Sequence, residues 1–329
     1  MKKLFFLAAV TIFVTGCFWD DDDFVIEKVV SVSQTPVNLS ALNSEYDDYN
    51  SDLHYKKDRR IIFSSNRNSH GNDFDLIYKN LLIQEHPVNP ENYGLTIEVY
   101  DYETPHYWET IFRNVNTSKN EFGPNMTVSG GELLLMYSTE NNTGHDIQFL
   151  DLSAWFAAKY NDFDTIPKTI PKINEYDDDL YPTLSTNREN LIFCSNRNDN
   201  VFNIYNAAFH DEITTESLIN GNTKSIEKLD VLSSSADDKC PFIGENEMMV
   251  FTSNREGGFG GYDLWYSFYQ NGQWTEPENF GSEINSNKDE FRPITLKIFG
   301  RNLMIFSSNR KGGMGGFDLY AVECETIKN

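Results

Sequence analysis

Short apolar runs alternate with polar turns along most of the chain, and this pattern predicts an all-β protein. The runs are rich in Phe, Tyr, Ile and Leu, and Asn, Asp, Ser and Gly separate them. Strand-length runs bounded by turn residues are typical of antiparallel sheets. Helical periodicity is nearly absent, and the one helix-compatible stretch begins at Leu152.

One apolar run recurs with the ending Ser-Asn-Arg, a loop rich in Gly or Asn, and an aromatic strand. Two copies are "FTSNREGGFGGYDLWYS" (251–267) and "FSSNRKGGMGGFDLYAV" (306–322). Three further copies begin at Phe63, Tyr137 and Phe193, the one at Tyr137 being the most worn. Aligned at the Asn of Ser-Asn-Arg, the copies fall at positions 66, 140, 196, 254 and 309, with intervals of 74, 56, 58 and 55 residues. A period of this size indicates a propeller or a solenoid.

An acidic turn precedes each copy. "INSNKDEFRPITL" (284–296) has counterparts that begin at Leu42, Val115, Ile173 and Leu232. Each unit therefore predicts an acidic turn, an inner strand, the Ser-Asn-Arg strand, an aromatic strand and an outer strand such as "WTEPENFG" (274–281).

This repeat resembles the TolB-like, WD-repeat-like β-propeller repeats over nearly the whole mature chain. The resemblance implies four-stranded blades around a central axis. Five copies predict five blades, and a sixth would require a degenerate blade hidden in residues 78–115. The last copy stops where its fourth strand should begin, and the segment from Thr35 aligns with the one from Glu276. An N-terminal strand is therefore expected to complete the last blade and remove the free sheet edges.

The repeated polar residues predict a ring at one axial face. Each Arg can pair with a carboxylate of an acidic turn, the loop glycines are expected at positive φ, and the Asp that follows can accept from loop amides. We interpret the set mainly as structural staples; the alternative is a ring that binds a ligand or a hard cation such as calcium. No other cofactor is expected. The ring comprises Asp47, Asp48, Arg67, Asp178, Asp179, Arg197, Asp237, Asp238, Arg255, Asp289, Glu290 and Arg310.

The N-terminus predicts a lipoprotein. "MKKLFFLAAVTIFVTGC" has a basic start, a short apolar run and a Cys, and its last four residues resemble the bacterial lipobox. The predicted organisation is a signal peptide (1–16), lipidated Cys17 with an acidic tether (17–29), and a single propeller domain (30–329). The run "DDDD" (20–23) also resembles surface-export signals of outer-membrane lipoproteins. The predicted location is the outer membrane, facing the periplasm or the cell surface.

Charge and motifs narrow the function classes. The formal net charge of −23 argues against nucleic acid as a partner. Cys194, Cys240 and Cys324 allow at most one disulfide and more simply predict buried thiols. No nucleophile elbow, Walker loop or dinucleotide fingerprint occurs, and the six His are scattered, so the chain is predicted not to be an enzyme.

These observations predict a membrane-anchored, non-catalytic module, a monomer or part of a complex, that binds an envelope protein or a glycan. The alternative is a carbohydrate-active enzyme of lyase or glycosidase type, which would need His or carboxylate groups converging beyond those of the repeat. The least repetitive part, residues 79–115, is a candidate docking insert, although a peripheral strand packed on the first blade would look the same. Its candidate interface residues are Tyr100, Tyr102, Tyr107 and Trp108.

Overall fold

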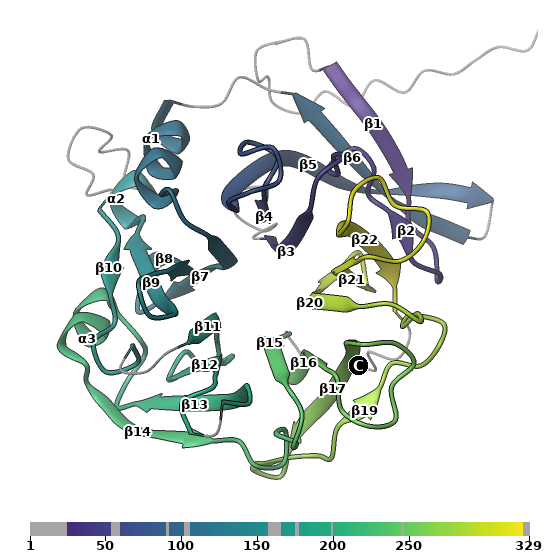
Figure 1. The fold of residues 1–329 in the computed structure, drawn as a ribbon. Coiled ribbons are helices and arrows are strands. Elements are labelled where there is room, and N and C mark those ends of the chain that lie inside the picture. The colour runs from purple at the N-terminus through teal and green to yellow at the C-terminus, as the bar shows by residue number, and fades with distance from the viewer. Residues whose placement is uncertain are drawn as a thin grey trace, which may run out of the picture.

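A computed structural model describes residues 25–53, 60–89, 92–101, 106–156, 166–174, 178–198, 200–244 and 247–324. In these residues five antiparallel sheets stand radially around one axis, and each turns one edge strand toward the centre (Figure 1). The protein is therefore an all-β, five-bladed propeller, as the repeat count predicts, and the six-bladed alternative is wrong.

The innermost strand of each blade is the one that follows an acidic turn. Blade 1 is β3 (Asp48–Leu53), β4 (Arg60–Ser65), β5 (Asp75–Asn89), β6 (Asn92–Asp101) and β1 (Val25–Ser31); blade 2 is β7 (Glu121–Ser129), β8 (Glu132–Glu140), β9 (His145–Asp151) and β10 (Lys168–Thr169). Blade 3 is β11 (Asp179–Leu184), β12 (Asn190–Ser195), β13 (Asn203–Phe209) and β14 (Thr223–Lys228). Blade 4 is β15 (Asp238–Ile243), β16 (Met248–Ser253) and β17 (Asp263–Gln270), with β18 (Gln273–Trp274) and β19 (Glu278–Asn279) both paired to β17. Blade 5 is β20 (Glu290–Ile298), β21 (Arg301–Ser308), β22 (Asp318–Glu323) and β2 (Val37–Asn38).

Apolar side chains fill the space between neighbouring blades. Five clusters of buried residues each join two adjacent blades, and together they close the circle. The aromatic residue two positions before Ser-Asn of each repeat is fully or almost fully buried in one of these clusters. Those residues are Phe63, Tyr137, Phe193, Phe251 and Phe306. Cys194, Cys240 and Cys324 are also buried, as free thiols.

The stretch between blades 1 and 2 belongs to the core of the molecule. Residues 79–101 continue β5 and form β6, which are the outer strands of blade 1. Helix α1 (His106–Val115) follows, and its Trp108 is fully buried against Tyr78 and Phe112. Trp108 is therefore unsuited to the predicted interface, because no surface of it is available. Tyr100 is half-buried on β6, Tyr102 lies outside the described residues, and the side chain of Tyr107 is not described.

Two other helices are short. Helix α2 (Ser153–Phe156) lies in the helix-compatible stretch, whereas α1 and α3 (Thr215–Asn220) were not expected from the sequence pattern. Helix α3 begins at a capping box on Thr214 and ends at Gly221 in the left-handed conformation, so local signals set both of its ends. Within the described residues, none of the helices has the length and apolar character needed to cross a membrane.

The N-terminal segment closes the ring in two places. β2 pairs with β22, so the last blade receives its fourth strand from the start of the chain, as predicted. β1 pairs with β6 on the outside of blade 1 and begins at Val25, within the stretch assigned to the tether. Cys17 lies outside the described residues. The closing link itself is Asn43, whose side chain accepts from the Leu319 amide at 2.8 Å and donates to its carbonyl at 3.0 Å.

We predict that Asn43→Ala lowers the unfolding free energy by about 1–3 kcal/mol, because it leaves the buried Leu319 amide unpaired and removes one of the two hydrogen bonds to the Leu319 carbonyl. Urea denaturation measures this loss. Asn285→Ala removes the equivalent bonds to Leu264 between blades 4 and 5 and should cost a similar amount. Exposed Asn222 is the control, and an equal effect of Asn222→Ala would contradict the prediction.

Candidate functional site

In four of the five blades, the second acid of the acidic turn pairs with the Arg of its own blade. Asp48, Asp179, Asp238 and Glu290 receive a guanidinium nitrogen at 2.5–3.0 Å from the four repeat arginines, and all four carboxylates are fully buried. The same guanidinium groups lie over the ring two positions before Ser-Asn, as Arg255 does over Phe251 at 5.0 Å. Buried charges of this kind are tolerated only when they are paired and hydrogen-bonded.

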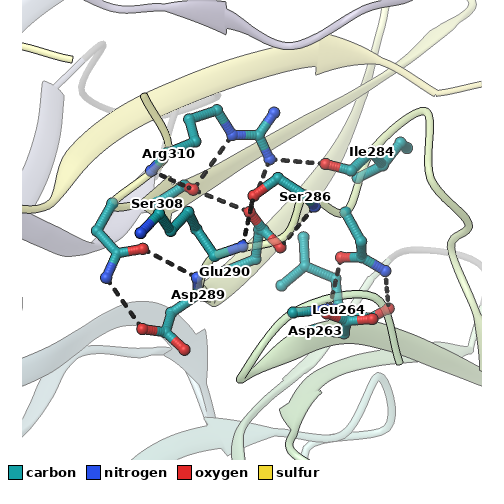
Figure 2. Close-up of polar contacts among 12 residues, drawn as sticks. Asp263, Leu264, Ile284, Ser286, Asp289, Glu290, Ser308 and Arg310 are labelled. Carbon is teal, nitrogen blue, oxygen red and sulfur yellow. Dashed lines mark hydrogen bonds and ion pairs between the residues drawn. The ribbon is translucent and has the colours of Figure 1, made fainter. Parts of the chain in front are cut away.

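Figure 2 shows this arrangement in blade 5. Arg310 donates to Glu290, to Ser308 Oγ at 3.1 Å and to the Ile284 carbonyl at 2.7 Å. Glu290 in turn accepts from Ser286 and Ser308. One ion pair therefore fixes the acidic turn, the inner strand and the Ser-Asn-Arg strand together.

The first acid of each turn points instead toward the preceding blade. Asp47 accepts from the Phe317 amide at 2.7 Å, Asp237 from the Phe202 amide at 3.1 Å, and Asp289 from the Tyr262 amide at 3.0 Å. Asp178 meets His145 Nδ1 of blade 2 at 2.7 Å. Repeat asparagines hold the same acids from within the blade, as Asn309 does for Asp289 at 2.9 Å. The two acids of a pair thus have different partners: the second forms an ion pair within its blade, and the first bonds to the preceding blade.

The loop glycines are needed mainly for close approach, which corrects the expectation of positive φ throughout. In the loop "GGFGG", Gly257 is the one glycine at positive φ, +92°. At Gly260 a Cβ would lie 1.9 Å from the Lys288 carbonyl oxygen of the next blade. Asp263 then accepts from the amides of Phe259 and Gly260, as predicted for this loop.

Blade 2 departs from this scheme. Asn141 stands where the other blades have Arg, and among the residues that the structure describes the fully buried Glu121 has no cationic partner and accepts from Thr117 and Thr139. Burial raises the pKa of Glu121 to about 7. Asn120 and Glu140 have exchanged the acid and amide roles that Asp47 and Asn66 play in blade 1, and Asn120 donates to Glu140.

The residues of the acidic ring therefore stabilise the fold. Its second acids are buried in ion pairs, and its first acids bond to neighbouring loops. Within the described residues, no group of three His, Cys, Asp or Glu side chains could hold a metal ion. The geometry of the acidic turns thus offers no support for bound calcium.

A second ring lies deeper along the axis. Each inner strand has one residue at positive φ, located where its pairing register shifts. The backbone N–H of such a residue can donate to the preceding blade, as Tyr181 does to Ser138 Oγ at 2.9 Å. These left-handed residues turn the strand at the same level in every blade; they are Asn50, Gly123, Tyr181, Cys240 and Arg292, with φ between 46° and 58°.

Two large side chains of this ring plug the axis. Tyr181 occupies the space beside Gly123, where a Cβ would lie 2.4 Å from the Tyr181 ring. Arg292 is fully buried and donates to the carbonyls of Pro124 and Pro241, both at 3.0 Å, so it links blade 5 to blades 2 and 4. Its Nε has no hydrogen-bond partner within the described residues.

Beyond the plug, a cavity of about 240 Å³ lies at the end of the axis opposite the acidic turns. Residues of all five inner strands line it, which makes it the place where the blades converge. Its polar lining is mixed in hydrogen-bonding character, and its apolar lining includes Leu184, Phe242 and Leu296. The polar side chains are Asp52, Asn125, Thr127, Thr183, Arg188, Thr295 and Lys297.

Asp52 is the only carboxyl among the described residues that line this cavity. Burial raises its pKa to about 6, against the opposing effects of the Met126 amide, which donates to it at 2.7 Å, and of the Arg292 charge. Asn125 lies beside it and is 5% exposed, and its Oδ1 has no hydrogen-bond partner in the described part of the chain. A buried carboxyl with a raised pKa and a neighbouring side-chain amide are groups through which a small polar ligand could be held.

Sequence reasoning missed this cavity. Its lining follows the acidic turn in each repeat, where the residues differ from blade to blade, whereas the predicted ring consists of recurring positions. The sequence signal that could have indicated the cavity is that these inner-strand positions do not follow the repeat. Asp52, Asn125, Thr183 and Thr295 occupy inner strands at similar distances from their acidic turns without sharing one residue type.

No family model matches the chain, and no curated protein matches it either. Solved structures do. A putative TolB from Agrobacterium tumefaciens is 12% identical, with 84% of this chain and 77% of that chain covered and a TM-score of 0.42. The GH43_1 enzyme from Xanthomonas citri, solved with xylose, is 10% identical, with 88% and 90% covered and a TM-score of 0.48. An α-L-arabinofuranosidase from Podospora anserina, solved with cellotriose, is 8% identical, with 91% and 96% covered and a TM-score of 0.48.

These similarities concern the fold. The resemblance to TolB-like propellers is confirmed at that level. The prediction that the chain is not an enzyme is wrong as a deduction from fold and missing motifs, because glycoside hydrolases are among the structural neighbours. Enzymatic activity has to be decided from the site itself.

We predict that Glu121→Gln flattens the pH dependence of stability. Because the folded-state pKa of Glu121 is raised from 4.5 to about 7, its contribution is most favourable below pH 4.5 and is lost as pH rises through 7. The variant should therefore gain on the order of 1–3 kcal/mol over the natural protein at pH 8 and little at pH 4.5. Urea denaturation at the two pH values measures this.

Glu290→Gln is the matched control, since Glu290 occupies the same place in blade 5 but faces Arg310. It should lose about 2–3 kcal/mol at pH 8, because the buried guanidinium loses its counter-charge. Equal effects of the two substitutions would show that the missing arginine of blade 2 has no energetic consequence.

Proposed function

We propose that the protein is a lipid-anchored envelope protein whose propeller binds a glycan in its axial cavity. The observation that carries this proposal is the convergence of all five inner strands on one cavity whose lining combines hydroxyl, amide and charged side chains with apolar ones. Binding sites are commonly concave and combine an apolar lining with a few placed polar groups.

The lining favours a hydroxylated ligand. Thr127, Thr183 and Thr295 provide hydroxyls that donate and accept, and Asn125 adds an amide. Sugar hydroxyls likewise donate and accept, so they suit such a mixture better than a purely ionic or apolar ligand. The volume of about 240 Å³ is below the roughly 300–1,000 Å³ of sites for drug-sized ligands, which favours a single sugar unit or the end of a chain.

The proposed anchor is lipid on Cys17, after cleavage of residues 1–16. Acyl chains contribute about 0.8 kcal/mol for each buried methylene, so a diacylated, N-acylated Cys would hold the protein stably at a membrane. The acidic stretch after Cys17 would serve as spacer, at the periplasmic or the outer face of the outer membrane. An envelope glycan or glycosylated protein would then lie within reach.

A second candidate function is carbohydrate cleavage. The favouring observation is Asp52, a buried carboxyl in the cavity whose pKa of about 6 suits a general acid. Glycoside hydrolysis ordinarily takes two carboxyl groups, and Asp52 alone lines the cavity among the described residues. Chain shortening of a bound oligosaccharide that is lost in Asp52→Asn would establish this activity.

The binding proposal is tested with the purified protein on an oligosaccharide array, followed by calorimetric titration of the best disaccharide. We expect Asn125→Ala to weaken binding by about tenfold or more, because a buried hydrogen bond to the ligand is lost. Asp230→Asn, at an exposed position on another part of the surface, is the control. Unchanged affinity in Asn125→Ala would locate binding elsewhere, and capture of a protein without any glycan would favour a protein partner.

The anchor is tested separately with radiolabelled palmitate in cells. We expect label on the natural protein and none on Cys17→Ser, which should leave the membrane fraction because it lacks the acyl chains. Label retained by Cys17→Ser, or none on either protein, would contradict lipidation at this residue.

A further inference from the structure

A second concave site lies between blades 3 and 4, at the same end of the molecule as the axial cavity. It has a volume of about 190 Å³. The turn from β11 to β12, the residue Glu247 before β16, and the hairpin from β17 to β18 surround it. Asn190 and Ile192 of β12 also line it, and none of the lining residues belongs to an acidic turn.

Two aromatic rings form one wall. Tyr269 and Trp274 are direct partners across the hairpin, with ring centroids 5.1 Å apart. The turn between them uses Asn271 and Gly272, both at positive φ, which is the conformation that such a two-residue hairpin requires. Tyr269 is 43% exposed, while Trp274 packs partly on the core between the blades. The wall therefore has one solvent-accessible ring and one ring that packing holds in place.

Polar side chains form the opposite wall. Asn206 on β13 is partly buried, and its Oδ1 is buried without a hydrogen-bond partner within the described residues. Asn187 comes from the β11–β12 turn, and Asn190 is the first residue of β12. Thr186 Oγ1 donates to Glu247 Oε1 at 3.4 Å, so blades 3 and 4 are joined at the edge of the site.

The site adjoins the axial cavity. Ile243, at the end of the inner strand β15, lines both. A ligand that occupies the axis and extends outward would therefore pass over Ile243 and meet the aromatic wall next. The two volumes together would accommodate a chain rather than a single unit.

We propose that this site, formed by Tyr269, Trp274, Asn187, Asn190, Asn206 and Glu247, is a second carbohydrate subsite. It takes the next units of the glycan whose end occupies the axial cavity, and in this it rests on the proposed function. The chemistry fits a neutral sugar ring: its C–H face packs on an aromatic face, and its hydroxyls reach amides and one carboxylate. Large, rigid aromatic side chains are also the residues that most often dominate binding energy.

The test compares a disaccharide with a tetrasaccharide of the same linkage, taken from the cello-, xylo- and chito-oligosaccharide series, by calorimetry on the purified protein. In the natural protein we expect the tetrasaccharide to bind about tenfold more tightly, since it also reaches the second subsite. Trp274→Ala should remove this preference and leave the disaccharide affinity unchanged. Asn206→Ala, which removes no intramolecular hydrogen bond of the side chain, should reduce the preference without the risk of unfolding.

Phe259→Ala is the control, an exposed aromatic residue of a Gly-rich loop on the opposite face, and it should change neither affinity. If both sugars bind and the preference is absent or survives both substitutions, the second subsite is refuted and the axial site stands. If Trp274→Ala weakens the tetrasaccharide while Asn125→Ala does not, the second subsite is supported and the axial site refuted. If no oligosaccharide binds, both proposals fail together.

Discussion

Two adjacent acidic residues at the start of each inner strand hold this propeller in register, because they act in different directions. In blade 5, Glu290 is buried against Arg310 of its own blade, while Asp289 accepts from the Tyr262 amide of blade 4. The first interaction stabilises a sheet and the second joins sheets. Since both residues are neighbours in the chain, the orientation of a blade is coupled directly to that of the blade before it.

This arrangement explains why so much charge can be buried. Four carboxylates have no exposed surface, yet each has a guanidinium partner. Blade 2 has Asn141 in place of the arginine, and among the described residues Glu121 accepts from Thr117 and Thr139. Burial raises the pKa of Glu121 to about 7, and it also raises the pKa of Asp179, which pairs with Arg197, to about 6.

The two ends of the axis consequently differ. At the acidic end, the polar side chains form hydrogen bonds within and between blades. Further along the axis, Tyr181 and Arg292 fill the centre of the propeller. At the other end the inner strands diverge from the repeat and leave a cavity with Asp52 and Asn125 in its lining. The residues at the acidic end therefore recur in the blades, whereas those at the opposite end differ from blade to blade. Functional residues are commonly found at such non-repeated positions of a rigid scaffold.

The sequence by itself determined the fold class, the blade number and the closure of the ring, because the repeat encodes local rules: strand-length apolar runs, turn glycines and the Arg at a fixed distance from its acid. It also placed residues 35–43 opposite the end of the last blade, where Asn43 contacts Leu319. It could not assign the two acids to different partners, since "DD" and "DE" look equivalent until the neighbouring blade is in place. Nor could it reveal that Trp108 is buried, or that Asp52, Asn125 and Thr295 meet. Those residues lie on separate blades and share no pattern, and only radial packing around one axis brings them together.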